Sequence, residues 1–319
     1  MQTALVAGGA GFIGKHLCES LLQDNYAVIC VDNFVSSDKK NVSEFLSNPN
    51  FKLVEQDIIE DFDFDLFPKL DFIFHLASPA SPNHHSKISY HALPLETMLV
   101  NTTGTLNLLK LAEKNKAKFL FASTSEVYGD PLEHPQKEEY RGNVSTTGPR
   151  SVYDESKRFG ETITAYFWRS RGVDGRIARI FNTYGPNMLK EDKRMIVDFI
   201  IQAIGNESIT VFGEGKQTRS LCFVSDTVDG LKKLMFSENT KAEIVNIGSD
   251  DEHSVLDYAN LVKKLTNSQS EIVFSEELPA DDPLQRKPDI SKAKKVLGWA
   301  PRVVLEDGLL KTIEYFRNL

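Results

Sequence analysis

Short runs of apolar residues alternate with longer segments of helical periodicity through the first half of the chain. The short runs are continuously apolar, which is typical of parallel strands that are buried on both faces of a sheet. They predict strands at 3–7, 27–31, 51–54, 72–76, 119–122 and 175–181. The segments between them predict helices at 12–22, 95–112 and 156–168. This alternation predicts an α/β fold with a Rossmann-type parallel sheet and helices on both of its faces.

The pattern becomes mixed after residue 182, where the apolar runs are shorter and less regular. Runs at 209–212 and 244–247 predict short strands of a smaller α/β lobe at the C-terminal end. The length of 319 residues is also about twice that of a usual domain. We therefore predict one domain at 1–182 and a second at 183–319, and the sequence leaves open whether 219–250 returns to the first domain.

Composition narrows the class of protein. With 41% hydrophobic and 26% charged residues, the chain has the composition of an ordinary soluble globular protein. A formal charge of -8 with scattered basic residues argues against a nucleic-acid partner. The cysteines Cys18, Cys30 and Cys222 form no CxxC pair, and no run of 18 apolar residues indicates a membrane segment. We expect a cytoplasmic protein with no membrane partner.

Glycines crowd the turn between the first predicted strand and the first helix, at Gly8, Gly9, Gly11 and Gly14. Glycines permit a tight turn and a close approach to a pyrophosphate, whose charge the helix N-terminus stabilises. Asp32 ends the second strand, where an acid can hydrogen-bond the adenosine ribose and repel a 2′-phosphate. No basic residue follows before position 39. The combination predicts a site for NAD rather than NADP.

A Tyr-x-x-x-Lys pair, Tyr153 and Lys157, begins a predicted helix, so both side chains lie on one helix face. A free tyrosine has a pKa of about 10, and its use as a base near neutral pH requires roughly 4 kcal/mol of phenolate stabilisation. A lysine ammonium and a positive nicotinamide ring can together supply this stabilisation.

Thr124 and Glu126 lie at the end of the fifth strand, where open parallel sheets bind ligands. The Thr124 hydroxyl is predicted to share a substrate oxygen with Tyr153.

These motifs resemble the extended short-chain dehydrogenase/reductases that act on nucleotide sugars, and within that family the UDP-glucuronate decarboxylases. The resemblance covers nearly the whole chain. The matching blocks are GGAGFIG at 8–14, HLASPASP at 75–82, STSEVYGDP at 123–131, GPR at 148–150, YDESK at 153–157, RIFNTYGP at 179–186, QTR at 217–219 and DDPLQRKPD at 281–289.

The resemblance implies roles for individual residues by matching position. Tyr153 is implied as the base, Lys157 as its modulator, Thr124 and Glu126 as substrate-positioning groups, and Arg286 as a neighbour of the sugar carboxylate. The residues implied to bind UDP are Asn182, Arg194 and Arg219. The implied NAD-binding residues are Gly8, Gly11, Phe12, Ile13, Gly14, Asp32, Asn33, Asp57, Ile58, Leu76, Ala77, Ser78, Tyr153 and Lys157. Members of the family dimerise through two long helices, so a homodimer is implied, with contacts near 95–112 and 156–168.

The reaction implied is the decarboxylation of UDP-glucuronate to UDP-xylose through a 4-keto intermediate, with NAD regenerated in the cycle. Related 4,6-dehydratases place an Asp where this chain has Ser125, and related epimerases usually lack the equivalents of Glu126 and of the pair Arg286 and Lys287. A UDP-hexuronate 4-epimerase and a nucleotide-sugar 4,6-dehydratase remain the alternative enzymes. An NAD-sensing regulatory protein is the non-enzyme alternative, and the intact Tyr153 argues against it.

One segment, 83–93, is longer than in many of these decarboxylases, and Leu99-Val100 replaces a common Lys-Thr pair. The segment contains His84, His85 and His91, but no Cys or acidic partner stands at ligand spacing, so no metal site is predicted.

Two acidic stretches also resemble binding motifs. The run Asp61, Asp63 and Asp65 imitates the start of a calcium loop but continues with Leu66 where that loop needs glycine, and is interpreted as a solvated connection. The stretch 276–282 is likewise interpreted as a solvated loop.

Overall fold

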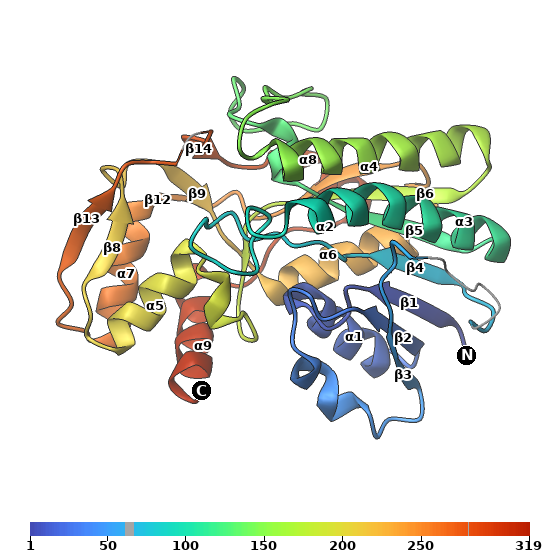
Figure 1. Ribbon diagram of the computed structural model, residues 1–319, viewed down its shortest axis with the longest axis horizontal. Helices are drawn as coiled ribbons and strands as arrows, with labels where there is room; N and C mark the ends of the chain where they lie inside the picture. The colour runs from blue at the N-terminus through green and yellow to red at the C-terminus, as the bar shows by residue number, and fades with distance from the viewer. Residues whose placement is uncertain (61–66, 280) are drawn as a thin grey trace.

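A seven-stranded parallel sheet forms the centre of the molecule (Figure 1). The computed structural model describes residues 1–60, 67–279 and 281–319, so the predicted connection at Asp61, Asp63 and Asp65 lies outside the described residues. The strand order is β11-β6-β5-β4-β1-β2-β3. The strands are β1 (Thr3–Ala7), β2 (Ala27–Asp32), β3 (Phe51–Glu55), β4 (Phe72–His75), β5 (Lys118–Thr124), β6 (Asp174–Ile180) and β11 (Ile244–Ile247). This sheet confirms the predicted fold class.

Helices cover both faces of the sheet, and strand β1 shows why its sequence is continuously apolar. Its residues Ala4 and Val6 belong to the core beneath α1 (Phe12–Gln23) and α6 (Val224–Phe236). The intervening Leu5 and Ala7 belong to the opposite core, beneath α3 (Thr105–Asn115) and α4 (Ser151–Ser170). Successive side chains of a strand point to opposite faces, so a strand buried on both faces needs an apolar residue at every position.

The helix predicted at 95–112 is a continuous helical segment with a wide turn in its middle. It consists of α2 (Pro94–Leu99), a π-helical turn at η3 (Val100–Gly104) and then α3. Within this turn Asn101 is fully buried, and its amide donates to the hydroxyls of Ser78 and Ser156, both at 3.1 Å. Single π-turns occur frequently at functional sites. Here the turn ties the end of β4 to helix α4.

The C-terminal lobe packs helices against small sheets (Figure 1). Strand β8 (Ile209–Phe212) pairs in parallel with β13 (Ile272–Glu276). Strand β9 (Thr218–Ser220) lies between β12 (Glu252–Ser254) and β14 (Gln285–Arg286), and β7 (Thr183–Tyr184) pairs with β10 (Cys222–Phe223). The helices of this lobe are α5 (Met195–Ile204), α7 (Val255–Thr266) and α9 (Leu305–Arg317), whereas α8 (Ser291–Leu297) packs against β11 and α6.

Strand β11 brings the chain back to the central sheet, where it pairs with β6 at the edge. The boundary between 1–182 and 183–319 stays a prediction. In the described part of the chain, no helix is both long and apolar enough to span a membrane. All three cysteines are buried with free thiols. The cytoplasmic location also stays a prediction.

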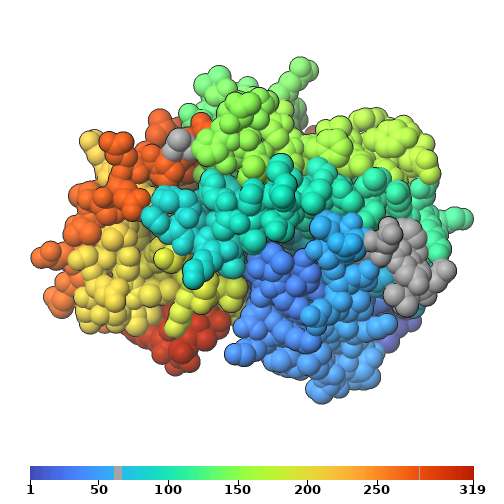
Figure 2. Space-filling model, in the orientation of Figure 1, coloured from blue at the N-terminus to red at the C-terminus, as the bar shows by residue number. Residues whose placement is uncertain are grey.

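The long segment 83–93 reaches from the end of β4 to the C-terminal lobe. The Asn83 amide donates to the Lys193 carbonyl at 2.6 Å, and the Ser86 hydroxyl donates to the Glu191 carbonyl at 2.5 Å. Just before the segment, the Ser81 hydroxyl donates to the Asp192 carbonyl at 2.6 Å. Figure 2 shows this part of the chain, in cyan, in contact with the yellow and orange C-terminal lobe. The segment therefore spans the two lobes.

Candidate active site

The glycine-rich turn after β1 has no room for side chains. Gly8 has a φ of +78°, and a Cβ there would lie 2.6 Å from the Ala77 nitrogen. A Cβ on Gly14 would lie 2.0 Å from the Gly8 carbonyl oxygen. The N-cap of α1 is Gly11, which offers no side-chain hydrogen bond to the first-turn amides. A tight turn that presents uncapped amides at a helix N-terminus is suited to a phosphate group.

Asp32 closes this turn from the end of β2. Its carboxylate accepts hydrogen bonds from the Ala10 amide at 2.9 Å, the Phe34 amide at 3.0 Å and the Ser37 hydroxyl at 2.8 Å. Burial nevertheless raises its pKa above the ordinary value, because desolvation outweighs these bonds. A carboxylate has about four lone-pair sites, so Asp32 retains capacity for a further donor such as a ribose hydroxyl.

Two adjoining cavities share Gly8, Gly11, Leu76 and Ser78. The larger, of about 360 Å³, runs from the glycine turn past the end of β5 to the C-terminal lobe. The smaller extends beneath Asp32. Every residue that the sequence predicted to bind the cofactor lines one of the two: Gly8, Gly11, Phe12, Ile13, Gly14, Leu76, Ser78, Tyr153 and Lys157 the larger, and Asp32, Asn33, Asp57, Ile58 and Ala77 the smaller.

Tyr153 and Lys157 lie on the buried face of α4, beside the end of β5. The Lys157 ammonium donates to the Ala122 carbonyl at 2.8 Å and lies 5.7 Å from the centre of the Tyr153 ring. Burial raises the pKa of Tyr153 to about 12, although the Thr124 hydroxyl acts in the opposite direction as a hydrogen-bond partner. Burial lowers the pKa of Lys157 to about 7. The protein alone therefore keeps Tyr153 protonated near neutral pH, and a further positive charge is needed for the phenolate to form.

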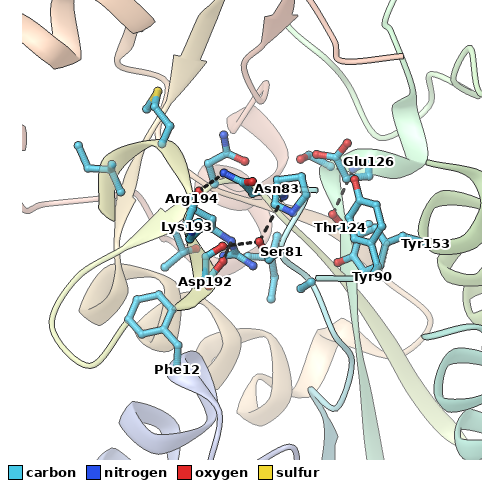
Figure 3. Close-up of a pocket in the computed structure, with 18 of the residues that line it drawn as sticks. Phe12, Ser81, Asn83, Tyr90, Thr124, Glu126, Tyr153, Asp192, Lys193 and Arg194 are labelled. Carbon is cyan, nitrogen blue, oxygen red and sulfur yellow. Dashed lines mark hydrogen bonds and ion pairs between the residues drawn. The ribbon is translucent and has the colours of Figure 1, made fainter. Parts of the chain in front are cut away.

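Tyr90, from the segment that spans the lobes, covers the ring of Tyr153 (Figure 3). The two rings are stacked, with centroids 5.0 Å apart and an interplanar angle of 9°. Tyr90 is completely buried, and the Arg150 guanidinium lies 5.9 Å from the centre of its ring. The sequence analysis assigned no role to Tyr90, because nothing in its local sequence indicates which distant side chain it contacts.

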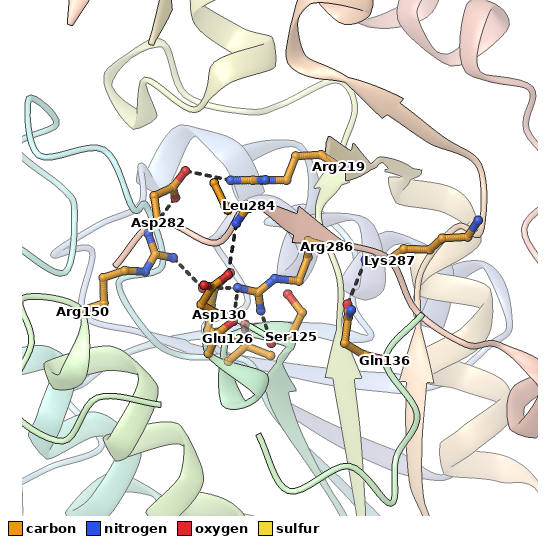
Figure 4. A network of polar contacts seen from close by, with 12 residues as sticks. Ser125, Glu126, Asp130, Gln136, Arg150, Arg219, Asp282, Leu284, Arg286 and Lys287 are labelled. Atoms are coloured by element: carbon orange, nitrogen blue, oxygen red, sulfur yellow. Dashed lines mark hydrogen bonds and ion pairs between the residues drawn. The ribbon is translucent and has the colours of Figure 1, made fainter. Parts of the chain in front are cut away.

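Charged side chains of opposite sign alternate in a chain of ion pairs beside the larger cavity (Figure 4). Glu126 pairs with Arg286 at 3.1 Å and with Arg150 at 2.5 Å. Asp282 pairs with Arg150 at 3.2 Å and with Arg219 at 2.8 Å. Burial would raise the pKa of Glu126, but the charges of Arg286 and Arg150 outweigh it and lower the pKa to about 2. Three guanidinium groups face two carboxylates, so this end of the cavity carries a net positive charge that favours an anionic ligand.

The structure places Arg286 behind Glu126. The Arg286 guanidinium is 1% exposed, and it donates to the carbonyls of Ser125 and Gly129 as well as to Glu126. Within the described residues the cavity wall includes Glu126, Arg150 and Asp282 but not Arg286. The family resemblance implied a role for Arg286 and none for Arg150. Of the two arginines that pair with Glu126, however, Arg150 is the one that lines the cavity.

The residues predicted to bind the nucleotide lie along the same cavity. Asn182, Arg194 and Arg219 all line it. Arg194 caps the start of α5 and pairs with Asp192 at 3.2 Å. The interpretation of 276–282 as a solvated loop was wrong for Asp282, which bridges the buried Arg150 and the half-buried Arg219. Distant charges decide the position of this residue, and they are invisible in its local sequence.

Known proteins are similar to this chain over most of its length. The sequence model described as the NAD dependent epimerase/dehydratase family matches residues 4–248. A Xenopus tropicalis protein named UDP-glucuronic acid decarboxylase 1 is 49% identical over 98% of this chain and 72% of its own length. An Arabidopsis thaliana protein with the same name is 47% identical over 98% of this chain and 69% of its own length.

A solved structure extends the comparison to bound ligands. The UDP-glucuronic acid 4-epimerase from Bacillus cereus, solved in complex with UDP-glucuronic acid and NAD, superposes with a TM-score of 0.89. It is 28% identical, and the match covers 99% of each chain.

Proposed function

The chain belongs to the NAD dependent epimerase/dehydratase family, and we propose that it converts UDP-glucuronate to UDP-xylose and carbon dioxide. The observation that carries this proposal is the placement of an ionised Glu126 and a cavity-facing Arg150 beside Tyr153. A tyrosine and lysine suited to alcohol oxidation thus adjoin a positive region suited to a carboxylate. Close relatives that share nearly the whole chain are named as decarboxylases of UDP-glucuronic acid.

NAD fits the two cavities on grounds of this structure. The turn at Gly8 and Gly14 admits no Cβ, which suits close contact with a pyrophosphate, and Asp32 retains capacity for a ribose hydroxyl. The pKa of Tyr153 is about 12, so the site calls for a further positive charge, which the oxidised nicotinamide carries. When bound, NAD would accept a hydride from C4 of the sugar and return it to the same carbon at the end of the cycle.

Residues of the chain itself transfer the protons of the reaction. Tyr153 takes the proton of the C4 hydroxyl as the C4 hydride leaves, with Lys157 and Thr124 next to it. The resulting C4 ketone is β to the C6 carboxylate, so the electrons of the C5–C6 bond move into the ketone as carbon dioxide departs. C5 then takes up one proton, and Tyr153 returns its proton to the C4 oxygen.

The charged groups hold the reacting sugar in place. Glu126 and Thr124 position the sugar hydroxyls, and Arg150 faces the carboxylate before it leaves. Arg286 secures the carboxylate of Glu126 from behind. Asn182, Arg194 and Arg219 hold the UDP along the rest of the cavity. Binding in a defined position lowers the entropic part of the barrier to oxidation, because the C4 hydroxyl is then held in reacting geometry with Tyr153 and the hydride acceptor.

A redox balance tests the proposal. The purified protein is incubated with UDP-glucuronate and NAD at a concentration well below that of the sugar, and carbon dioxide and NADH are followed together. We expect release of many equivalents of carbon dioxide per NAD with no accumulation of NADH. Release that stops after one equivalent, with stoichiometric NADH, would contradict a closed redox cycle.

We also propose that the protein is a homodimer formed by α2 and α4. These helices pack against each other and expose Leu95, Leu99, Phe159 and Tyr166, each by at least 42%. Exposed apolar side chains gathered on neighbouring helices are typical of an interface. Sedimentation at micromolar concentration should give the mass of a dimer, and a monomer would remove this proposal.

A further inference from the structure

Two adjacent histidines of the segment that spans the lobes meet a carboxylate from the far lobe. The His85 Nε2 atom lies 3.1 Å from Glu276 Oε1, and the His84 Nε2 atom lies 3.6 Å from Glu276 Oε2. All three ligand atoms lie within 4.8 Å of one another. The sequence predicted no metal site here, because no acidic residue stands at ligand spacing from these histidines along the chain. Glu276 supplies that partner from a position about 190 residues further along the chain.

We propose that His84, His85 and Glu276 form a binding site for a divalent transition cation of the zinc type. Metal bonds to imidazole nitrogen and carboxylate oxygen are about 2.0 to 2.2 Å long, so ligand atoms around a tetrahedral zinc lie roughly 3.3 Å apart. Measured to the one oxygen that both histidines approach, Glu276 Oε2, the nitrogen–oxygen separations are 3.4 Å from His85 and 3.6 Å from His84, close to that value. Two imidazoles and one carboxylate are also a known ligand set for zinc, with the fourth position open to water.

The backbones that carry these three side chains are fixed by other contacts. Asn83 accepts a hydrogen bond from the His85 amide at 2.9 Å, while its own amide is anchored to Lys193. On the other side, Glu276 is paired with Phe212 in the β13–β8 ladder, and its carbonyl accepts a hydrogen bond from the Gly213 amide at 2.7 Å. Because the backbone of both segments is already held in place, the three side chains need only small movements to close around a cation.

The surroundings of the cluster favour a cation over a simple surface ion pair. The His84 and His85 rings are 4.0 Å apart and direct their Nε2 atoms at the same carboxylate. A single carboxylate can balance only one imidazolium, whereas a divalent cation can bind both neutral imidazoles and the carboxylate together. Among the residues that the structure describes, this is also the one group of three such side chains with suitable spacing.

The position of the cluster gives the cation a structural effect. His84 and Asn83 line the large cavity, as does Phe212, the ladder partner of Glu276. A cation held by all three ligands would join the segment 83–93 to strand β13 at the edge of that cavity. None of these three ligands has a role in the proposed reaction, so the cation site does not depend on it.

Zinc binding by the untagged, chelator-treated protein tests the site. Isothermal titration with zinc chloride should show one Zn²⁺ per chain, and Co²⁺ should give a visible absorption band typical of imidazole coordination. Mg²⁺ should not bind, because it prefers oxygen ligands. His85→Ala and Glu276→Gln should each weaken Zn²⁺ binding by at least about tenfold and abolish the Co²⁺ band. These side chains are nearly half exposed, so both variants are expected to fold, which circular dichroism can verify.

A matched control is His253→Ala. His253 is a partly exposed histidine paired with a single carboxylate, Asp251, at 3.0 Å, with no second imidazole in the pair. This variant should bind Zn²⁺ as the unaltered chain does. The proposal is overturned if the unaltered chain shows no saturable Zn²⁺ binding, or if His85→Ala and Glu276→Gln bind as tightly as His253→Ala.

Discussion

Removal of the Arg286 guanidinium by Arg286→Ala should destabilise the fold as well as the reaction. The side chain is almost completely buried and pairs with Glu126 at 3.1 Å. It also donates to the carbonyls of Ser125 and Gly129. Truncation leaves two buried carbonyls and one carboxylate short of a partner.

The size of the effect follows from these contacts. Loss of one partner of a buried ion pair costs about 3–5 kcal/mol, because the remaining charge stays buried without compensation. Glu126 keeps its second partner, Arg150, so we expect the lower end of this range, a loss of about 3 kcal/mol in the free energy of unfolding. Urea denaturation near neutral pH, followed by circular dichroism, measures it. The control is Arg171→Ala, whose pair with Glu113 is exposed to solvent, so its loss should change the free energy of unfolding far less.

The pH dependence of the free energy of unfolding tests the same contact. The pKa of Glu126 is lowered from 4.5 to about 2, so the unfolded chain takes up its proton first as the pH falls. The stabilisation by ionised Glu126 is therefore complete above about pH 4.5 and is lost as the pH falls toward 2. The difference in free energy of unfolding between Arg286→Ala and the unaltered chain should therefore decrease as the pH falls through this range. A difference no larger than that of Arg171→Ala, or one that does not change with pH, would refute the reasoning.

Three further predictions concern the base, the cofactor and a buried acid. Tyr153→Phe should fold and bind NAD while turnover falls by roughly 10²–10⁴, and near-normal turnover would remove Tyr153 from the mechanism. Asp32→Ala should weaken NAD binding and narrow the preference over NADP, and unchanged discrimination in titrations with both cofactors would argue against the ribose contact. Burial and the charge of Glu126 raise the pKa of Asp154 from 3.8 to about 8, so this group lowers the stability of the fold progressively as the pH rises from about 4 to about 8. Asp154→Asn should therefore stabilise the fold at about pH 9 and change it little at about pH 4 in thermal melts, and equal effects at both pH values would contradict the assignment.

Much of the sheet could be predicted because its signals are local. Strands buried on both faces need continuous apolar runs, and the predicted strand at 3–7 coincides with β1. The glycine turn and the Tyr153 and Lys157 pair are also local patterns, and the structure places them along one cavity. Family resemblance, rather than spacing, supplied the candidates Arg194 and Arg219.

The rest depends on contacts between residues that are far apart in the sequence. The stack of Tyr90 on Tyr153, the bridge of Asp282 between Arg150 and Arg219, and the meeting of Glu276 with the histidines all join distant segments. Periodicity carries no information about such pairs, because a side chain's partner is decided by how the lobes pack. The same reason explains why the sequence did not show that Arg286 pairs with Glu126 while Arg150 lines the cavity.

The identity of the product tests the central claim most directly. The purified protein is supplied with UDP-glucuronate and catalytic NAD, and the nucleotide sugar is examined by mass spectrometry and NMR. We predict a product that has lost carbon dioxide and has the proton spectrum of UDP-xylose. A product of unchanged mass would indicate epimerisation, and loss of water would indicate dehydration. Either result, or turnover of a neutral nucleotide hexose with none of UDP-glucuronate, would contradict the decarboxylase assignment.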